Sequence, residues 1–206
     1  MGWGKALFSP RRTHPMRIRV VRHGKPSYRY GSRNRRSDAA EFNESLDRYD
    51  RAGLEDEWNR ARAPELSAAH IYVSDLPRAM ETATLCTDLA LDAMEVDAMF
   101  REVPLPRFRE GRLRLPLFVW MAVARLTWYL GRVGHPPTES RAEARERVRR
   151  AADALESGAG EHEDVLLFAH GFFLFLLGKE LRRRGWSTAK RGLYHYMEVA
   201  EFHKDA

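Results

Sequence analysis

Hydrophobic and polar positions along this chain form short segments, and most of these segments predict a strand. Residues 17–21 alternate between polar and apolar side chains, and residues 70–73 and 96–100 are short runs rich in strand-forming residues. Residues 165–169 are apolar at every position, which is typical of a strand buried on both faces of a sheet. A last strand is predicted within residues 194–202.

Helical patterns lie between these strands. Small residues at helical spacing predict a helix after Ser74 and Asp75, which are expected to cap it. A capping box of Ser140 and Glu143 begins a helix that is predicted to end at Gly158 and Gly160, and another helix is expected over residues 172–184. Alternating strands and helices predict an α/β fold: a three-layer sandwich with a mostly parallel central sheet and helices on both faces.

Two segments interrupt this pattern. Residues 25–52 show no clear period and predict a long loop followed by a short helix. Three prolines break the chain between residues 104 and 116. Residues 117–130 are apolar almost all round, which predicts a buried helix or a cap over a site. A dimer face and a membrane-surface contact are the alternatives for this segment. We expect a flexible leader at residues 1–15 and a single domain at residues 16–206, with an insertion at about residues 103–137.

Composition and charge exclude several classes of protein. Among 206 residues, 44% are hydrophobic and 31% charged, which is ordinary for a globular protein and too apolar for a disordered tail. Cys86 is the single cysteine, so a framework of internal disulfides is excluded. No run of about 18 apolar residues predicts a membrane span, and the first 15 residues lack the apolar stretch of a secretory signal, so we expect a cytoplasmic protein.

Polar residues that could take part in catalysis or ligand binding follow three of the predicted strands. Arg22, His23 and Gly24 follow the first strand, and Ala169, His170 and Gly171 span the end of a later one. Ser74 ends a third strand, with Arg78 one helical turn further on. In open α/β sheets ligands bind at the carboxyl ends of strands, so these groups are expected to form an anion site that contains a nucleophile.

The residue types suit attack on phosphorus. A neutral imidazole is a nucleophile, and surrounding guanidinium groups neutralise the charge that develops on a transferring phosphoryl group. The leaving oxygen then needs a proton. We prefer Glu102 to Glu110 as its source, because Glu102 directly follows the predicted strand at residues 96–100.

Four motifs in order resemble those of the histidine phosphatase superfamily, also called the phosphoglycerate mutase-like family. They are Val20-Val21-Arg22-His23-Gly24, then Val73-Ser74-Asp75-Leu76-Pro77-Arg78-Ala79-Met80-Glu81-Thr82-Ala83, then Phe100-Arg101-Glu102, and last Leu167-Phe168-Ala169-His170-Gly171. Each motif alone is weak, whereas four in family order are specific. The resemblance extends from about residue 17 to residue 202.

The resemblance implies a role for each matching position. His23 would become phosphohistidine, while Arg22, Arg78 and His170 would bind and stabilise the phosphoryl group. Glu102 would protonate the leaving oxygen and then activate water. Gly24, Lys25, Ser74 and Gly171 complete the expected substrate-binding set, and no metal or cofactor is implied.

Departures from the family pattern favour a phosphatase. Lys25-Pro26 stands where the family often has Glu-Ser or Glu-Thr, and residues 27–36 do not resemble the stretch that the mutases carry after the first motif. We therefore expect a metal-independent phosphomonoester hydrolase that acts on a small-molecule or protein substrate. A phosphoglycerate mutase-like phosphotransferase is the enzyme alternative.

The charge of the chain motivates an alternative from another class. The formal charge is +6, and arginines gather in residues 29–36, so a weakly catalytic module that binds phosphoproteins or polyanions stays open. The same arginines could select polyanionic or nucleotide-like substrates. Nucleic acid is an unlikely partner, and a homodimer is left open.

Overall fold

A five-stranded sheet lies at the centre of the computed structural model, which describes residues 15–28, 35–132 and 134–205. In sheet order the strands are β4 (Glu95–Asp97), β3 (His70–Ser74), β6 (Asp164–Ala169), β1 (Met16–Arg22) and β7 (Val199–Lys204). The first four are parallel, and β7 pairs with β1 in the antiparallel sense. The predicted mostly parallel sheet is therefore confirmed.

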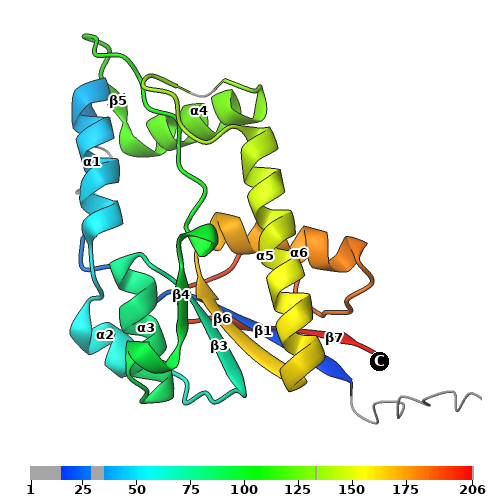
Figure 1. Cartoon of the computed structure of the whole chain (residues 1–206). Helices are drawn as coiled ribbons and strands as arrows, with labels where there is room; N and C mark the ends of the chain where they lie inside the picture. The colour runs from blue at the N-terminus through cyan, green and yellow to red at the C-terminus, as the bar shows by residue number, and fades with distance from the viewer. Residues whose placement is uncertain (1–14, 29–34, 133, 206) are drawn as a thin grey trace, which may run out of the picture.

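Helices cover both faces of this sheet (Figure 1). Helices α5 (Arg141–His162) and α6 (Gly171–Arg183) pack on one face, and α3 (Pro77–Thr87) and α2 (Asp56–Arg60) pack on the other. Strand β6 serves both layers: Val165 and Leu167 join the α5–α6 core, whereas Leu166 and Phe168 join the α3 core. All four side chains are fully buried, as the apolar run predicted.

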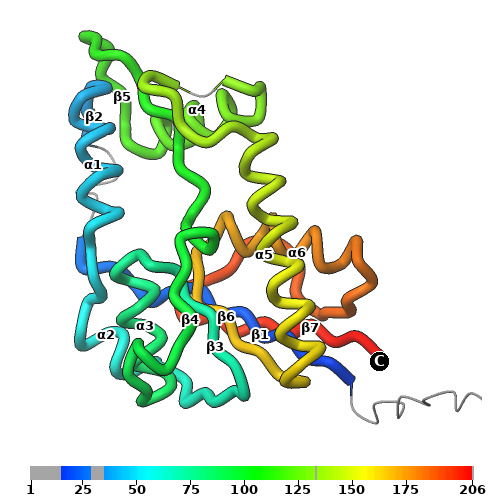
Figure 2. The backbone as a smooth tube through the Cα atoms, in the orientation of Figure 1, coloured from blue at the N-terminus to red at the C-terminus, as the bar shows by residue number. Residues whose placement is uncertain are grey.

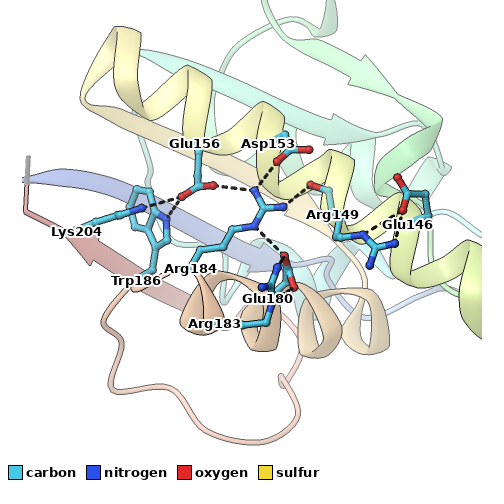
Figure 3. A network of polar contacts seen from close by, with 9 residues as sticks. All are labelled: Glu146, Arg149, Asp153, Glu156, Glu180, Arg183, Arg184, Trp186 and Lys204. Atoms are coloured by element: carbon cyan, nitrogen blue, oxygen red, sulfur yellow. Dashed lines mark hydrogen bonds and ion pairs between the residues drawn. The ribbon is translucent and has the colours of Figure 1, made fainter.

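A network of charged side chains joins α5, α6 and the end of the chain (Figure 3). The guanidinium of Arg184 lies 2.5 Å from Asp153, 2.7 Å from Glu156 and 2.8 Å from Glu180. Glu156 also accepts hydrogen bonds from Trp186 and Lys204, at 2.8 and 3.0 Å. These bonds hold the C-terminal end of α6 against α5. The N-terminal end of α6 lies at the site described below.

A second region, which we call the lobe, lies beyond the carboxyl ends of the parallel strands. It consists of α1 (Ala39–Arg51), α4 (Leu117–Tyr129) and a two-stranded sheet of β2 (Arg36–Ser37) and β5 (Leu115–Pro116). Figure 2 shows the chain leaving β4 and running away from the main sheet before it reaches β5 and α4. The lobe has a small core of its own, formed by Ala39, Phe42, Leu46, Trp120 and Ala124.

Helix α4 is present as predicted, but its predicted burial is wrong. One face, with Trp120, Ala124 and Trp128, is buried at a spacing of four residues. The opposite side is open, since Leu126 is 59% exposed. Apart from Arg125 and Thr127 the helix is apolar all round, so its pattern gives little signal for the side that packs.

Two predicted boundaries also differ from the structure. Helix α5 continues past Gly158, because this glycine makes room for Tyr72: a Cβ here would lie 2.6 Å from the tyrosine hydroxyl. Strand β4 ends at Asp97, whose side chain accepts a hydrogen bond from the Met99 amide and begins a 3-10 turn, η2 (Ala98–Phe100). A second such turn is η1 (Leu91–Ala93).

Two further differences concern the loops. The short helix expected at the end of residues 25–52 is the 13-residue α1, which begins with a capping box of Asp38 and Glu41. The last strand begins only at Val199, because Met197 has a φ of 60° that extended strands do not allow.

None of the helices in the described part of the chain is long and apolar enough to cross a membrane. The expected leader lies outside the described residues, except for Pro15.

Candidate active site

The three strand ends that carry the motifs meet at one edge of the sheet. Strands β3, β6 and β1 are neighbours and parallel, so Ser74, His170 and His23 emerge on the same side. The ring centroids of His23 and His170 are 4.9 Å apart, and both side chains are at most 1% exposed. The structure therefore brings together the two histidines that the sequence singled out.

The His23 ring is held in one tautomer. Its Nδ1 lies 2.7 Å from the backbone oxygen of Gly24, and because a carbonyl only accepts, Nδ1 carries the proton. Nε2 then has a free lone pair, towards which Arg78 Nε donates at 3.3 Å. Burial, reinforced by the charges of Arg78 and Arg22, lowers the pKa of His23 well below its ordinary value. His23 is thus a neutral imidazole with its nucleophilic nitrogen beside a guanidinium.

Arg78 links the nucleophile to the lobe. Its side chain is fully buried, and Nη1 donates to the backbone oxygens of Tyr49 and Asp50, at 3.0 and 3.3 Å. Nη2 lies 3.2 Å from Asp50 Oδ1. Arg78 begins α3, whereas Tyr49 and Asp50 end α1, so one side chain fixes the two helices and the His23 ring relative to each other.

Of the two arginines beside His23, Arg22 lines the open pocket and Arg78 does not. Its Nη1 donates to the Tyr194 oxygen at 2.5 Å, and the guanidinium lies 4.2 Å from the Tyr196 ring centroid. Its Nε is buried and has no hydrogen-bond partner among the described residues. A Cβ on Gly171 would lie 3.0 Å from that nitrogen, so the glycine leaves room for the guanidinium.

His170 is oriented by Ser74. The Ser74 hydroxyl lies 2.8 Å from His170 Nε2, while His170 Nδ1 is buried with no partner among the described residues. Burial is the main cause that lowers the pKa of His170 well below its ordinary value, and the neighbouring His23, Arg78 and Arg22 lower this pKa further. The expected cap of α3 is therefore wrong in detail, because Leu76 is the N-cap and the Ser74 hydroxyl is engaged with the histidine.

Glu102 lies at the N-terminus of α6. Its carboxylate accepts hydrogen bonds from the backbone amides of Val103, Phe172 and Phe173, at 2.9, 3.1 and 2.8 Å. These donors include the first free amides of the helix, where the helix dipole favours a carboxylate. Glu102 lines the pocket, whereas Glu110 is exposed and is not among the residues that line it.

Gly24 and Lys25 are held on the other side of His23, next to α2. The Gly24 amide donates to Thr82 Oγ1 at 2.8 Å, and a Cβ here would lie 2.2 Å from Asn59 Oδ1. The Lys25 ammonium lies 2.6 Å from Glu55 Oε2. Neither Gly24 nor Lys25 is among the described residues that line the pocket. The buried His23, Ser74, Arg78 and His170 are also absent from that lining, so of the expected set the lining contains Arg22, Glu102 and Gly171.

A pocket of about 1390 Å³ lies between the sheet edge and the lobe. From the sheet side it is lined by Arg22, Glu102 and Gly171, and from the lobe by residues of α1 and α4. Among the latter is Arg125, which lies 3.8 Å from the Phe172 ring centroid and whose Nη1 is buried without a partner in the described part of the chain. A phosphoryl group at Arg22 would thus have its leaving group inside this pocket.

The sequence reasoning missed three residues around His23. Tyr49 and Tyr196 flank the imidazole, with ring centroids 6.5 and 5.7 Å away, and hydrogen bond to each other. Asp50 lies beside Arg78, and burial raises the pKa of its carboxyl against the opposing effect of that arginine. Their segments carried no motif, so only the folded position of α1 and of the loop before β7 reveals them.

The described residues contain no cluster of three His, Cys, Asp or Glu side chains arranged to hold a metal ion. Outside the site, the exposed His203 lies 3.4 Å from Glu201. The groups of the site that could bind an anion are its guanidinium groups and imidazoles.

Comparisons with known proteins agree with this geometry. The family description "Histidine phosphatase superfamily (branch 1)" matches residues 18–204. No curated protein matches the chain. Many solved structures share the fold, and three of them are compared with this chain. The open reading frame Rv3214 of Mycobacterium tuberculosis has a TM-score of 0.60 at 19% identity, covering 95% of this chain and 96% of that one.

The other two are a phosphatase and a mutase. A mycobacterial glucosyl-3-phosphoglycerate phosphatase has a TM-score of 0.58 at 21% identity, covering 91% of this chain and 90% of its own. A phosphoglycerate mutase from Bacillus anthracis has a TM-score of 0.58 at 18% identity, covering 91% of this chain and 87% of its own. The match over nearly the whole sequence shows that this chain belongs to the histidine phosphatase superfamily, branch 1.

Proposed function

We propose that this protein hydrolyses phosphomonoesters without a metal ion, through a phosphohistidine intermediate on His23. One observation carries the proposal: the proton of His23 lies on Nδ1, against the Gly24 carbonyl, which leaves the Nε2 lone pair beside a fully buried arginine. A neutral imidazole held in this way needs no base to become a nucleophile.

The first step is attack of Nε2 on phosphorus. The N–P bond forms as the bond from phosphorus to the ester oxygen breaks, and the electron pair of that bond leaves with the oxygen. Negative charge on the phosphoryl oxygens is then stabilised by Arg22, Arg78 and His170. The unpartnered Nε of Arg22 and Nδ1 of His170 support this role, because buried polar nitrogens are rarely left without an acceptor.

The protonated form of Glu102 gives its proton to the leaving oxygen and thereby becomes a carboxylate. In the second step the same carboxylate removes a proton from water, whose oxygen attacks phosphorus and releases orthophosphate and free His23. The three backbone amides that hold Glu102 fix its position at the pocket wall, where both the leaving group and the incoming water pass.

The substrate is a small-molecule or protein phosphomonoester, and hydrolysis is favoured over phosphoryl return. The leaving group lies in a wide pocket, which gives water a route to the intermediate once that group departs. Relatives with the same fold are named both as a phosphatase and as a phosphoglycerate mutase, so the choice rests on this site and on the sequence after the first motif.

The test is phosphate release from a panel of phosphomonoesters, with and without EDTA, for the wild type and for His23→Ala. We expect release that is unaffected by EDTA and that falls by about 10⁴-fold or more in the variant. Acid-labile, base-stable phosphate on the wild-type chain after rapid quenching would identify the N–P bond.

Two results would contradict the proposal. Full activity in a folded His23→Ala protein would exclude the nucleophile. A phosphorylated isomer formed with little free phosphate would instead identify a mutase. Circular dichroism of the variant establishes that its loss of activity does not reflect unfolding.

A further inference from the structure

Most of the pocket lies beyond the reach of a phosphoryl group. Ligand pockets commonly have volumes of about 300–1000 Å³, and this one, at about 1390 Å³, is larger. Its walls away from His23 are formed largely by apolar side chains from the lobe, from α6 and from the segment after Glu102. They include Leu46, Val103, Leu105, Met121, Phe172 and Phe175.

Several charged side chains also line the pocket, and six of them hold ion pairs. Arg101 binds Asp75 through two hydrogen bonds of 2.5 and 2.6 Å. Arg147 binds Glu139 in the same way, at 2.6 Å for each bond. Arg107 pairs with Asp47, and Asp50 pairs with Arg78. These pairs provide little attraction for an additional anionic group, whereas Arg22, Arg51 and Arg125 line the pocket without an ion pair in the described part of the chain.

The rim of the pocket carries exposed apolar side chains beside the charged and exposed Asp50, Arg51 and Arg101. Met121 and Tyr129 on α4 and Leu193 before β7 line it, although they are 37%, 41% and 63% exposed. Exposed apolar side chains that gather around an opening mark a surface that an apolar molecule covers. Here they continue the apolar wall outward, from the cationic end at Arg22 to solvent.

We propose that the substrates are phosphomonoesters of long or bulky apolar alcohols, with the phosphate at His23 and the apolar group along the wall formed by α4 and α6. This inference rests on the proposed function, because it assigns the leaving group of the same reaction. A long apolar chain fits the observed lining: Arg22 at the end next to His23, then walls that are largely apolar apart from Arg125 and the ion pairs, and apolar side chains among those exposed at the rim.

The first experiment measures kcat/KM for methyl, butyl and octyl phosphate, all kept below their micellar concentrations. A buried methylene group contributes a factor of about four, so we expect kcat/KM to rise about two- to fourfold per added methylene until the wall is covered. Glycerol phosphate, which adds polar atoms in place of methylenes, is expected to match methyl phosphate.

A matched pair of variants tests where the chain lies. Met121 and Leu126 are both exposed apolar residues of α4, but of the two only Met121 lines the pocket. In Met121→Glu we expect kcat/KM for octyl phosphate to fall about tenfold more than for methyl phosphate. Leu126→Glu is expected to leave both values within about twofold of the wild type. Leu193→Glu, in a different segment of the rim, should repeat the effect of Met121→Glu.

The source of the apolar phosphate is tested separately. Phosphatidic acid in phosphatidylcholine vesicles is a membrane-borne substrate, whereas octyl phosphate below its micellar concentration is a dissolved one. Preference for either over methyl phosphate supports the inference and identifies the source. Preference for neither overturns it.

The failure of this inference differs from failure of the proposed function. If methyl, butyl and octyl phosphate are hydrolysed with equal kcat/KM, the substrate class is wrong and the phosphatase stands. Equal loss in Met121→Glu and Leu126→Glu also overturns the assigned wall. If no phosphomonoester releases phosphate with a folded wild-type protein, the proposed function itself is wrong.

Discussion

The sheet half and the lobe face the same pocket but are built in opposite ways. At the sheet edge, charged and polar side chains are fully buried and held by hydrogen bonds, as with Arg78, His23 and Ser74. In the lobe, apolar side chains such as Leu126 and Met121 are exposed. The first arrangement leaves one geometry for one reaction, whereas the second leaves a surface that other molecules can cover.

The two halves also differ in how they are stabilised. The sheet is enclosed by two extensive cores, so each strand of the site is supported on both faces. The lobe depends on a small core between α1 and α4. We therefore expect changes in the sheet half to affect the reaction or the whole fold, and changes in the lobe to act locally.

After His23→Ala, the largest effect is expected from Glu102→Gln. Loss of the proton donor should lower kcat about 10²- to 10⁴-fold for an alkyl phosphate, and less for p-nitrophenyl phosphate, whose leaving group needs no proton. Steady-state phosphate release measures both values. Glu110→Gln, exposed and away from the pocket, is the control and should have wild-type activity. Equal losses with both leaving groups would exclude proton donation by Glu102.

Trp120→Ala tests whether the lobe is a separate unit. Trp120 is 5% exposed, stacks with Phe42 at 5.7 Å and donates to the Ser37 oxygen at 2.8 Å. Its loss should destabilise the lobe by about 3–5 kcal/mol. Hydrogen exchange should then speed up in α1 and α4, while β6 and β1 stay protected.

Phe168→Ala is the counterpart in the sheet half. This side chain is fully buried beside α3, so its truncation should speed up exchange throughout the protein. If Trp120→Ala exposes β6 to the same degree as α4, the two halves unfold together and the comparison fails.

The buried histidines predict how stability depends on pH. The pKa values of His23 and His170 are lowered in the folded protein, whereas in the unfolded chain they are near 6.5. Below about pH 6.5 the unfolded chain binds protons that the folded protein does not. The free energy of unfolding should therefore fall as the pH falls, by up to about 1.4 kcal/mol per pH unit for each histidine, and these two groups should contribute no slope above that pH.

Urea unfolding at pH 7.5, 6.0 and 5.0 measures this slope. In His23→Asn the free energy of unfolding should depend less steeply on pH, because one of the two buried titrating groups is gone. His203→Gln is the control, because His203 is 46% exposed on its side chain and lies outside the site. An identical slope in the wild type and in His23→Asn would show that the buried imidazole takes up its proton as readily as an unfolded one.

The smallest effects concern surface ion pairs, and here too the halves should differ. Arg184→Met removes the centre of the network between α5 and α6 and should cost about 1–2 kcal/mol. Arg48→Met on α1 removes an exposed pair with Glu44 and should cost less than about 0.5 kcal/mol. Midpoints of urea unfolding compare the two. An equal loss of stability in Arg184→Met and Arg48→Met would contradict the expected difference between the two halves.

The sheet half could be predicted from the sequence because its signals are local. An apolar run such as residues 165–169 identifies a central strand, and the His-Gly that follows it identifies a strand end at the site. Parallel neighbours then place His23 and His170 at the same edge, as the structure shows. Capping by Ser140 and Glu143 was equally visible, since both partners lie within one turn.

The lobe could not be predicted in the same way. An all-apolar helix does not reveal which side packs, so the exposed face with Leu126 had no signal in the sequence. Asp50 and Tyr49 reach Arg78 only because α1 folds back to α3, a contact between positions 28 and 29 residues apart. The pairing of Lys25 with Glu55 likewise depends on where α2 lies.

Arg78 also bears on how such a protein can be re-engineered. The guanidinium that contacts His23 is fixed by two carbonyl groups at the last turn of α1, and α1 is half of the core of the lobe. A graft that replaces the lobe with that of a relative would thus replace the support of Arg78 and His23 as well. New specificity is better introduced at the pocket walls on α4, with α1 kept intact, so that Arg78 retains its anchor.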